Sequence, residues 1–396
     1  MPEGEPGSRV TLQDVADRAG VSLATASRVV NEGSRRVGQK FADRVNQAVA
    51  ELGYTANLQA RAVATGQSTM LGVIVHDIAD PYFSSIAAGL IEVAAAQQLL
   101  VCMSSTPVGV AAEAAARAGG ARGSGTSGAR GSGTGGARGT GTGGAWGSAA
   151  AAGMGGAVEV AEREYVALMR AQRARAVVLI GSRSDDAEAT AALRAELAAF
   201  TGSGGRAACI GQDLLGVDTI QPENAAGAEA LATALAALGH RSFAVLAGPR
   251  GLLTARDRVD GFRAGLAAWS VPLDPARVIY GAFTRDGGYE AMSTILAAGE
   301  PLPDCVFAVT DVMAVGALAR LRASGISVPG DIAVAGFDDI HTLRDVYPPL
   351  TTVRLPLKRM GEMAAGLVLG GAGRRIMPVP GEVILRDSTI PHPPAA

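Results

Sequence analysis

The sequence predicts an α/β protein with a small all-α unit at its N-terminus and a large body of two parallel-sheet subdomains. Residues 9–66 contain short, polar-rich helical segments, whereas residues 70–104 and 158–390 alternate brief β-rich runs with amphipathic helical stretches. A segment rich in Gly, Ala, Arg, Ser and Thr lies between the two parts of the body. Strands that alternate with helices are typical of βαβ units, and therefore of a parallel sheet.

The body contains eight candidate strands, four before about residue 220 and four after it, which favours two sheets with a cleft between them. Apolar runs such as VVLI and VFAV do not alternate with polar residues, as expected of strands that helices cover on both faces. The strands are expected at Met70–Val75, Leu99–Met103, Ala176–Ile180, Arg206–Ile210, Ser242–Ala247, Arg277–Tyr280, Cys305–Val309 and Ile332–Gly336. The helices are expected at Phe83–Gln97, Glu159–Gln172, Asp186–Phe200, Asn224–Leu238, Thr254–Ala268, Gly287–Ala298 and Asp311–Ser324.

Composition restricts the class of protein. The chain has 396 residues, 48% of them hydrophobic, and contains no run of about 18 apolar residues that would span a membrane. Residues 1–8 lack the apolar segment of a secretion signal. Cys102, Cys209 and Cys305 lie far apart between apolar residues, which predicts reduced thiols in the core of a cytosolic protein.

Charge is distributed unevenly along the chain. The formal net charge is −2, yet residues 9–66 contain 8 basic and 5 acidic side chains. The N-terminal unit is therefore basic and the remainder is acidic on balance. This asymmetry indicates that the small unit binds a polyanion.

The Gly-rich segment at 108–157 repeats every eight residues, as GGARGSGT from Gly119 and GGARGTGT from Gly135. It has too few apolar side chains to form a core, so we predict a disordered insertion. Two interpretations stay open for it: a surface loop without a direct function, or an Arg/Gly arm that contacts nucleic acid or a partner.

Residues 10–31 have the pattern of a helix-turn-helix. Thr11 is placed to cap a first helix, with Asp14 in the capping-box position. Gly20 supplies the left-handed turn residue, and Ser22 is placed to cap a second helix. A third helix, Gln39–Leu52, covers the pair, and the expected core residues are Leu12, Val15, Ala16, Ala19, Val21, Ala26, Val29, Val30, Phe41, Val45, Ala48, Val49 and Leu52. The N-terminus of the second helix is then free to enter a major groove, although a small helical hairpin without a DNA role has similar spacing.

This segment closely resembles the DNA-binding headpiece of the LacI/GalR repressor family. The matching motifs are Thr11-Leu12, Asp14-Val15-Ala16, Ala19-Gly20-Val21-Ser22, Ser27-Arg28-Val29-Val30-Asn31 and Glu51-Leu52-Gly53-Tyr54. The resemblance implies that Leu23, Ala24 and Thr25 read base edges and that Arg28 contacts guanine or phosphate. It further implies that the remaining DNA contacts, mostly to phosphate, come from Thr11, Ser22, Ser27, Asn31, Asn57, Arg61 and Val63.

The resemblance also implies a hinge helix over residues 59–68, after a DNA-binding domain at 9–58. In the family this helix forms on operator DNA and inserts a leucine into the minor groove, but here Val63 holds that position and Ala56 replaces the usual proline. Valine is shorter and less favourable in a helix, so we expect a looser hinge. The alternative is that residues 59–68 are a flexible linker.

Residues 69–390 resemble the family's effector-binding and dimerisation domain, a periplasmic-binding-protein-like pair of α/β subdomains. The matches include Leu71–Val75 with Asp80-Pro81-Tyr82-Phe83, Gly248-Pro249 and Gly336-Phe337-Asp338-Asp339. The predicted first subdomain comprises about 69–220 and a return near 342–355, and the second comprises about 221–341 and 356–390. The resemblance implies an effector site formed by Tyr82, Ser182, Thr254, Arg258, Phe283, Thr310 and Asp338.

Arg258 and Asp338 are expected to bracket a polar ligand, because fixed donors and a pure acceptor suit vicinal hydroxyls. Phe283 is expected to stack on the apolar face of a sugar. Alternatively, the Arg–Asp pair only latches the subdomains together. His76 stands where the family has proline, and a structural role is favoured for it, as is a core position for Phe337.

These observations predict a DNA-binding transcriptional regulator, a repressor of carbohydrate genes that a small sugar-like effector controls. The expected partners are a pseudo-palindromic duplex, the effector and a second copy of the chain, with no membrane. No cofactor and no metal are expected, since Asp338-Asp339 lacks accompanying His, Cys or Glu ligands. Two other classes of protein are disfavoured. A sugar receptor without a DNA role would need a secretion signal. An enzyme on a doubly wound fold would need a nucleophilic-serine motif or a glycine-rich motif that opens a helix after a strand, and the sequence contains neither.

Overall fold

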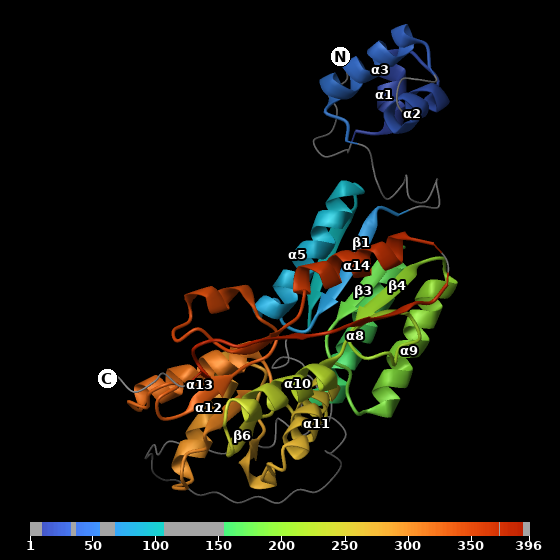
Figure 1. The fold of residues 1–396 in the computed structure, drawn as a ribbon. Coiled ribbons are helices and arrows are strands. Elements are labelled where there is room, and N and C mark those ends of the chain that lie inside the picture. The colour runs from blue at the N-terminus through green and yellow to red at the C-terminus, as the bar shows by residue number, and fades with distance from the viewer. Residues whose placement is uncertain (1–9, 33–36, 56–67, 107–153, 372, 391–396) are drawn as a thin grey trace, which may run out of the picture. The chain divides into compact units, whose positions relative to one another are not determined.

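The computed structural model describes residues 10–32, 37–55, 68–106, 154–371 and 373–390 (Figure 1). The chain divides into two compact units, Met1–Thr69 and Met70–Ala396, which we call the headpiece and the body. The predicted hinge contacts Asn57, Arg61 and Val63 lie outside the described residues, as does nearly all of the Gly-rich segment.

The headpiece contains three helices, α1 (Leu12–Ala19), α2 (Leu23–Glu32) and α3 (Gln39–Leu52). Both predicted caps are confirmed. Thr11 Oγ1 accepts a hydrogen bond from the Asp14 N–H at 3.3 Å, and the Thr11 N–H donates to the Asp14 carboxylate at 2.7 Å. Ser22 Oγ accepts from the Thr25 N–H at 3.2 Å, and Gly20 has the left-handed φ of 63° that the turn requires.

The headpiece has its own apolar core, formed by Val15, Ala16, Ala19, Ala26, Val29, Ala42, Val45 and Ala48. The prediction was wrong for Phe41, whose side chain is 47% exposed. Ala42, the next residue on α3, is fully buried in its place, because one residue of helix rotates the side chain by about 100°.

The body begins with a six-stranded parallel sheet in the order β11-β5-β4-β3-β1-β2. These strands are β1 (Met70–Val75), β2 (Leu100–Ser105), β3 (Ala176–Ile180), β4 (Arg206–Ile210), β5 (Asp218–Pro222) and β11 (Ile376–Val379). Helices cover both faces: α5 (Pro81–Ala96) and α14 (Leu357–Leu369) on one, α8 (Met154–Ala171) and α9 (Ala187–Gly202) on the other (Figure 1). We call this sheet and its helices the first subdomain.

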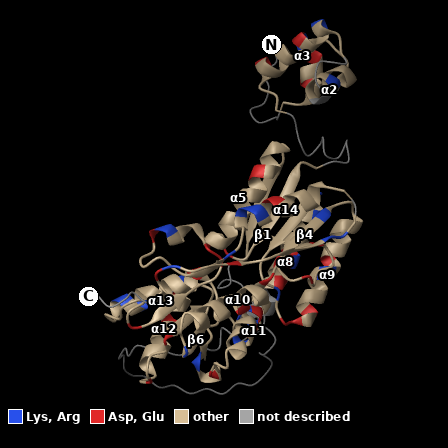
Figure 2. Ribbon diagram, viewed as in Figure 1, with Lys and Arg blue, Asp and Glu red and all other residues tan. Residues whose placement is uncertain are grey.

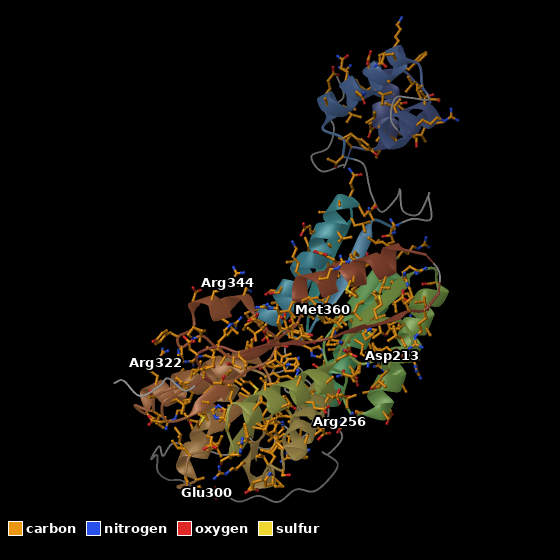
Figure 3. All side chains as sticks on the ribbon, in the orientation of Figure 1. Asp213, Arg256, Glu300, Arg322, Arg344 and Met360 are labelled. Atoms are coloured by element: carbon orange, nitrogen blue, oxygen red, sulfur yellow. The ribbon has the colours of Figure 1, made fainter. Side chains whose placement is uncertain are left out.

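Strand β3 shows why its apolar run does not alternate. Val178 and Ile180 belong to the core beneath α5 and α14, whereas Val177 and Leu179 belong to the core beneath α8 and α9. Met360 of α14, labelled in Figure 3, is fully buried in the former core. The prediction of a parallel sheet covered on both faces is confirmed.

The second subdomain has a four-stranded parallel sheet in the order β7-β6-β8-β9. Its strands are β6 (Phe243–Leu246), β7 (Val278–Ile279), β8 (Cys305–Ala308) and β9 (Ala333–Ala335). Its helices pack in pairs, α10 (Asn224–Ala237) with α11 (Leu253–Ala268), and α12 (Arg285–Ala297) with α13 (Asp311–Ala323). A separate antiparallel pair, β10 (Thr352–Arg354) and β12 (Glu382–Ile384), lies near the crossovers between subdomains.

The predicted assignment of the C-terminal segments to subdomains was wrong. Thr351 forms a bridge with Ala335 of β9, which places the segment near 342–355 with the second subdomain. Residues 357–379 return to the first, because α14 packs on α5 and β11 pairs with β5. Similarly, α8 begins at Met154, so the last four residues of the predicted insertion are helical.

No helix among the described residues is long and apolar enough to cross a membrane. Figure 2 shows acidic and basic residues across the helices of the body rather than in one block. Cys209 and Cys305 are buried and free, and Cys102 is half-buried and free.

Candidate functional sites

Helix α2 presents its N-terminal residues outward, as a DNA-reading helix requires. Ser22, Leu23, Ala24 and Arg28 are exposed, and Thr25 is half-buried. Leu23 is 46% exposed and lies outside the headpiece core, so its side chain is available for contact with a base-edge methyl group. Ser27 is half-buried, and α2 includes Asn31, although the Asn31 side chain lies outside the described residues.

Two of the predicted phosphate-contacting hydroxyls already have partners within the headpiece. Thr11 Oγ1 donates to the Asp14 carboxylate at 2.7 Å, and the hydroxyls of Ser22 and Thr25 lie 2.8 Å apart. Arg18 is engaged elsewhere, in an ion pair with Glu51 at 2.5 Å. These bonds stabilise the helix ends. Arg28 is the exposed basic side chain of α2.

A cavity lies in the body where the parallel strands end. His76 follows β1, Ser182 comes shortly after β3, and Thr310 comes shortly after β8. Loops at the carboxyl ends of strands are where open α/β sheets bind ligands. The cavity has a volume of about 200 Å³.

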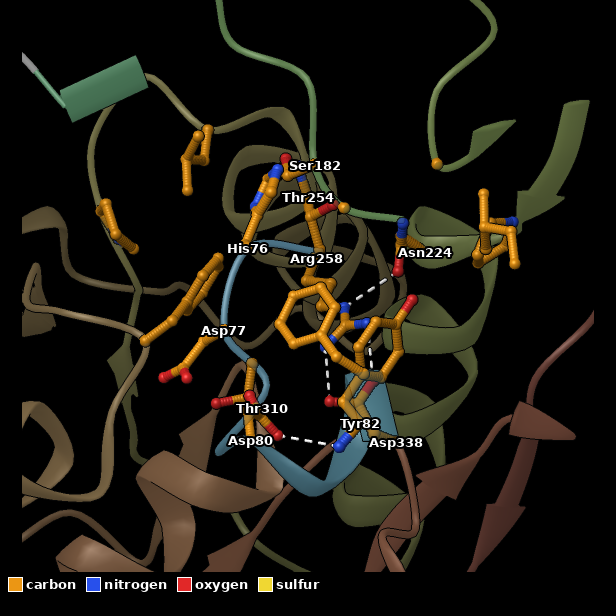
Figure 4. A pocket seen from close by; sticks show the side chains of 18 of the residues that line it. His76, Asp77, Asp80, Tyr82, Ser182, Asn224, Thr254, Arg258, Thr310 and Asp338 are labelled. Carbon is orange, nitrogen blue, oxygen red and sulfur yellow. Dashed lines mark hydrogen bonds and ion pairs between the residues drawn. The ribbon is translucent and has the colours of Figure 1, made fainter. Parts of the chain in front are cut away.

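All seven predicted effector residues line this cavity. They are Tyr82, Ser182, Thr254, Arg258, Phe283, Thr310 and Asp338. Figure 4 shows Arg258 between Asn224 and Asp338, with Ser182 and Thr254 close together. The structure thus brings together side chains from both subdomains that are up to 256 positions apart in the sequence.

Arg258 is the centre of the polar network. Its guanidinium donates to Asn224 Oδ1 at 2.9 Å, to the Val309 carbonyl at 2.6 Å and to both carboxylate oxygens of Asp338, at 2.8 and 3.3 Å. It also lies 3.8 Å from the centre of the Phe337 ring, which is fully buried, so the prediction that Phe337 is a core residue is confirmed. Both members of the ion pair belong to the second subdomain, so the pair does not latch the two subdomains together.

A hydrogen bond joins the two walls of the cavity. The Thr254 N–H at the start of α11 donates to Ser182 Oγ, which follows β3, at 2.9 Å. Thr254 Oγ1 accepts from the Gln212 side chain at 3.1 Å. Thr310 caps α13, because its hydroxyl accepts from the Met313 N–H at 3.4 Å.

Asp80 is an acidic residue of the cavity that was not predicted as a site residue. Its carboxylate caps α5, accepting from the Tyr82 N–H at 2.9 Å. Burial raises the pKa of Asp80 to about 7, and the nearby carboxylates of Asp338 and Asp77 add to this increase. Burial also raises the pKa of Asp338 to about 7, although Arg258 opposes the change.

The raised pKa of Asp80 makes stability depend on pH. The ordinary value is 3.8, so the folded state holds this proton more tightly than the unfolded chain does. The contribution to the free energy of unfolding is present at low pH and is lost as pH rises through about 7. We expect Asp80→Asn to reduce the decline in melting temperature between about pH 4 and pH 7; parallel curves for the two proteins would contradict the raised pKa.

A second buried charge cluster lies behind the cavity. Arg183 donates two hydrogen bonds to Glu162 of α8, at 2.5 and 2.8 Å, and His76 Nε2 lies 3.3 Å from Glu162 Oε1. Although burial opposes ionisation, the Arg183 partner lowers the pKa of Glu162 to about 2. Among the described residues His76 Nε2 has no hydrogen-bond partner, although Glu162 Oε1 lies 3.3 Å from it.

Other residues of the cavity also escaped prediction, including Asp77, Phe83, Pro222 and Asn224. Asn224 begins α10 directly after β5, a strand that was not predicted, so its place at a strand end was not recognised. Asp80 and Phe83 lie in the quoted Asp-Pro-Tyr-Phe motif, which contained the signal for both. Among the described residues no group of three His, Cys, Asp or Glu side chains is arranged to hold a metal ion.

Comparison with known proteins connects both sites to one family. Residues 11–57 match the model of bacterial regulatory proteins of the lacI family, and residues 232–389 match a periplasmic binding protein-like domain. The chain is 30% identical over 377 residues to the HTH-type transcriptional regulator CelR of Thermobifida fusca, an alignment that covers 94% of each protein. The chain belongs to the LacI family.

A second curated relative and two solved structures support the same family assignment. The HTH-type transcriptional repressor CytR of Escherichia coli K12 is 28% identical over 386 residues, covering 96% of each chain. Among solved structures, a lac repressor dimer bound to operator and the anti-inducer ONPF has a TM-score of 0.73 at 26% identity, covering 97% of this chain and all of the other. A CelR–cellobiose complex has a TM-score of 0.60 at 25% identity, covering 96% and 100%.

Membership confirms the predicted fold class and identifies the chain as a transcriptional regulator with a helix-turn-helix headpiece. The matched relatives are named as regulators rather than enzymes.

Proposed function

We propose that this regulator is a cytoplasmic repressor of carbohydrate-metabolism genes. It binds a pseudo-palindromic operator as a homodimer, and a sugar-like effector raises or lowers its affinity for the operator. The observation that carries the proposal is the presence in one chain of an outward-facing helix α2 and a cavity that both α/β subdomains line. A transport receptor would need only the second feature.

Coupling between the two sites requires that the effector binds two states of the body with different affinities. The cavity supports this requirement, because its walls come from separate subdomains that the Ser182–Thr254 hydrogen bond joins. A ligand placed between them changes how the subdomains pack. In the proposed mechanism that change reaches the predicted hinge at 59–68 and alters the order of the hinge on DNA.

The DNA-binding part is tested by comparing two arginines of the headpiece. Arg28→Ala removes the exposed basic side chain of α2. Arg18→Ala removes an arginine of the same unit that is paired with Glu51. We expect Arg28→Ala to weaken operator binding about 5- to 150-fold, the effect of losing about 1–3 kcal/mol from one base contact, and Arg18→Ala to have a small effect. Operators are first selected from random duplexes, and affinities are then measured at one fixed salt concentration.

Equal losses for the two variants would contradict the assignment of α2 as the reading helix. A loss in both that disappears at low salt would indicate general electrostatic attachment instead.

The effector-binding part is tested at Gly248, which follows β6. A Cβ atom at this position would overlap the ring of Phe283. We therefore expect Gly248→Ala to displace Phe283 and weaken binding of a stabilising sugar about 10-fold, with operator binding retained. Gly366→Ala on α14 is the matched control, because nothing lies within 4 Å of its added Cβ. Unchanged sugar affinity in Gly248→Ala would remove Phe283 from the site.

A further inference from the structure

The charged groups of the cavity restrict the class of effector, an inference that rests on the proposed function. The acidic residues that line the cavity are Asp77, Asp80 and Asp338, and among the residues that the structure describes the lining contains one arginine and no lysine. That arginine is Arg258. The net charge of a bound effector therefore depends on whether Arg258 is free to pair with it.

Arg258 makes four hydrogen bonds within the protein, which use four of its five N–H groups. Each of its three nitrogens donates to Asn224, the Val309 carbonyl or Asp338. Its side chain and that of Asp338 are 2% and 3% exposed, so this ion pair is buried and its charges neutralise each other. A ligand anion would have to compete with Asp338 for the charge of the guanidinium, and displacing Asp338 would leave that carboxylate buried without a partner.

Asp77 and Asp80 have no cationic partner among the described residues. Asp77 Oδ1 accepts from the Ala79 N–H at 2.8 Å, and Asp80 Oδ1 accepts from the Tyr82 N–H at 2.9 Å. These bonds occupy one oxygen of each carboxylate. Both acids line the cavity, and Figure 4 shows Asp80 next to Thr310 and bonded to Tyr82.

The remaining basic group of the cavity is His76, and an acidic residue already faces it. Its Nε2 lies 3.3 Å from Glu162, which is held ionised by Arg183. The carboxylate of Glu162 therefore faces His76 as a counter-charge within the protein. The pKa of Asp80 is raised to about 7 mainly by burial, and the carboxylates of Asp338 and Asp77 add to the increase; a bound cation would favour its ionised form.

The walls add aromatic faces to this acidic site. Tyr82, Phe83 and Phe283 all line the cavity. The faces of such rings attract organic cations and stack on the apolar faces of sugars. They give an anion no stabilisation.

We propose that the effector is a hydroxylated molecule without negative charge, and that Asp77 and Asp80 select an amino sugar over the neutral sugar and reject its phosphate ester. Hydroxyl groups of the ligand would bond to the Ser182 and Thr254 side of the cavity. A protonated amine would face the two unpaired carboxylates.

The test uses the full-length protein and two sets of matched probes, measured by thermal shift and titration calorimetry at about pH 7. One set is glucosamine, glucose and glucose 6-phosphate; the other is galactosamine, galactose and galactose 6-phosphate. In the set that binds, we expect the amino sugar to bind at least about 10-fold more tightly than the neutral sugar, and the phosphate ester to give no stabilisation. Tighter binding of a phosphate ester than of its parent sugar would overturn the inference while leaving a carbohydrate effector in place.

The double variant Asp77→Asn/Asp80→Asn locates the cause. Asparagine keeps the oxygen that accepts from the Ala79 and Tyr82 N–H groups, so the loop and the cap of α5 are retained. We expect the ratio of amino-sugar affinity to neutral-sugar affinity to fall at least about 10-fold. Asp274→Asn is the control, since Asp274 caps a short helix in the same way outside the cavity.

A preference for the amino sugar that survives in the double variant would overturn the roles of Asp77 and Asp80. Absence of binding by all six probes would overturn this inference together with the proposal that a hexose-like effector controls the protein. Operator binding measured on the same sample would then show whether the DNA-binding part of the proposed function still holds.

Discussion

Replacing Arg258 with alanine is expected to abolish stabilisation by the effector and to lower the free energy of unfolding by about 3–5 kcal/mol. The substitution removes the donors to Asn224, Val309 and Asp338. Asp338, whose side chain is 3% exposed in the native protein, then loses its ion-pair partner. Breaking a buried pair on one side costs more than removing both charges, because one buried charge then has no compensation. Chemical denaturation of the body, with and without a stabilising sugar, measures both effects.

The double variant Arg258→Ala/Asp338→Asn separates stability from ligand binding. It removes both charges, so we expect it to recover part of the lost stability but none of the lost affinity. Full effector affinity in Arg258→Ala would contradict a role for this residue in the site. Equal stability of the single and double variants would contradict the coupling between the two side chains.

Removing residues 1–69 is expected to abolish specific operator binding and to leave a folded, effector-binding body. The structure supports this separation, because the chain divides at Thr69 and the headpiece core at Val15, Ala16 and Val45 shares no member with the cores of the body. Affinity for the selected operator should fall to the level of nonspecific duplex, at least about 10³-fold. The melting temperature of the body and its shift with sugar should be retained.

Two results would contradict this modular account. One is a truncated body that does not fold, measured by circular dichroism. The other is a truncated body that still prefers the operator over unrelated duplex.

The strands of the body that were predicted correctly are those with strongly apolar sequences. β3, with the sequence AVVLI, is fully buried and lies within the predicted bounds. β5 and β11 were missed because each contains a proline, and β11 also has exposed residues such as Ile376 and Met377. Local pattern also does not determine which sheet a returning segment joins, and for this reason the segments near 342–355 and 356–379 were assigned to the wrong subdomains.

The residues of the cavity were likewise predicted where a local sequence motif marks them and missed where it does not. Arg258 and Asp338, which belong to motifs that resemble those of the family, line the cavity. Asn224 was missed because its position depends on β5, and Asp77 because nothing in its local sequence distinguishes a loop acid from a cavity acid. Phe41 of the headpiece failed for a related reason, since its side chain lies one position away from the buried face of α3.

The most direct test of the central claim is the affinity of the full-length protein for its selected operator, measured with and without the sugar that most raises its melting temperature. If the cavity and the headpiece are coupled, the sugar changes the dissociation constant about 5- to 150-fold in either direction, and Arg258→Ala removes the change. An operator affinity that is the same at every concentration of a sugar that demonstrably occupies the cavity would contradict the account.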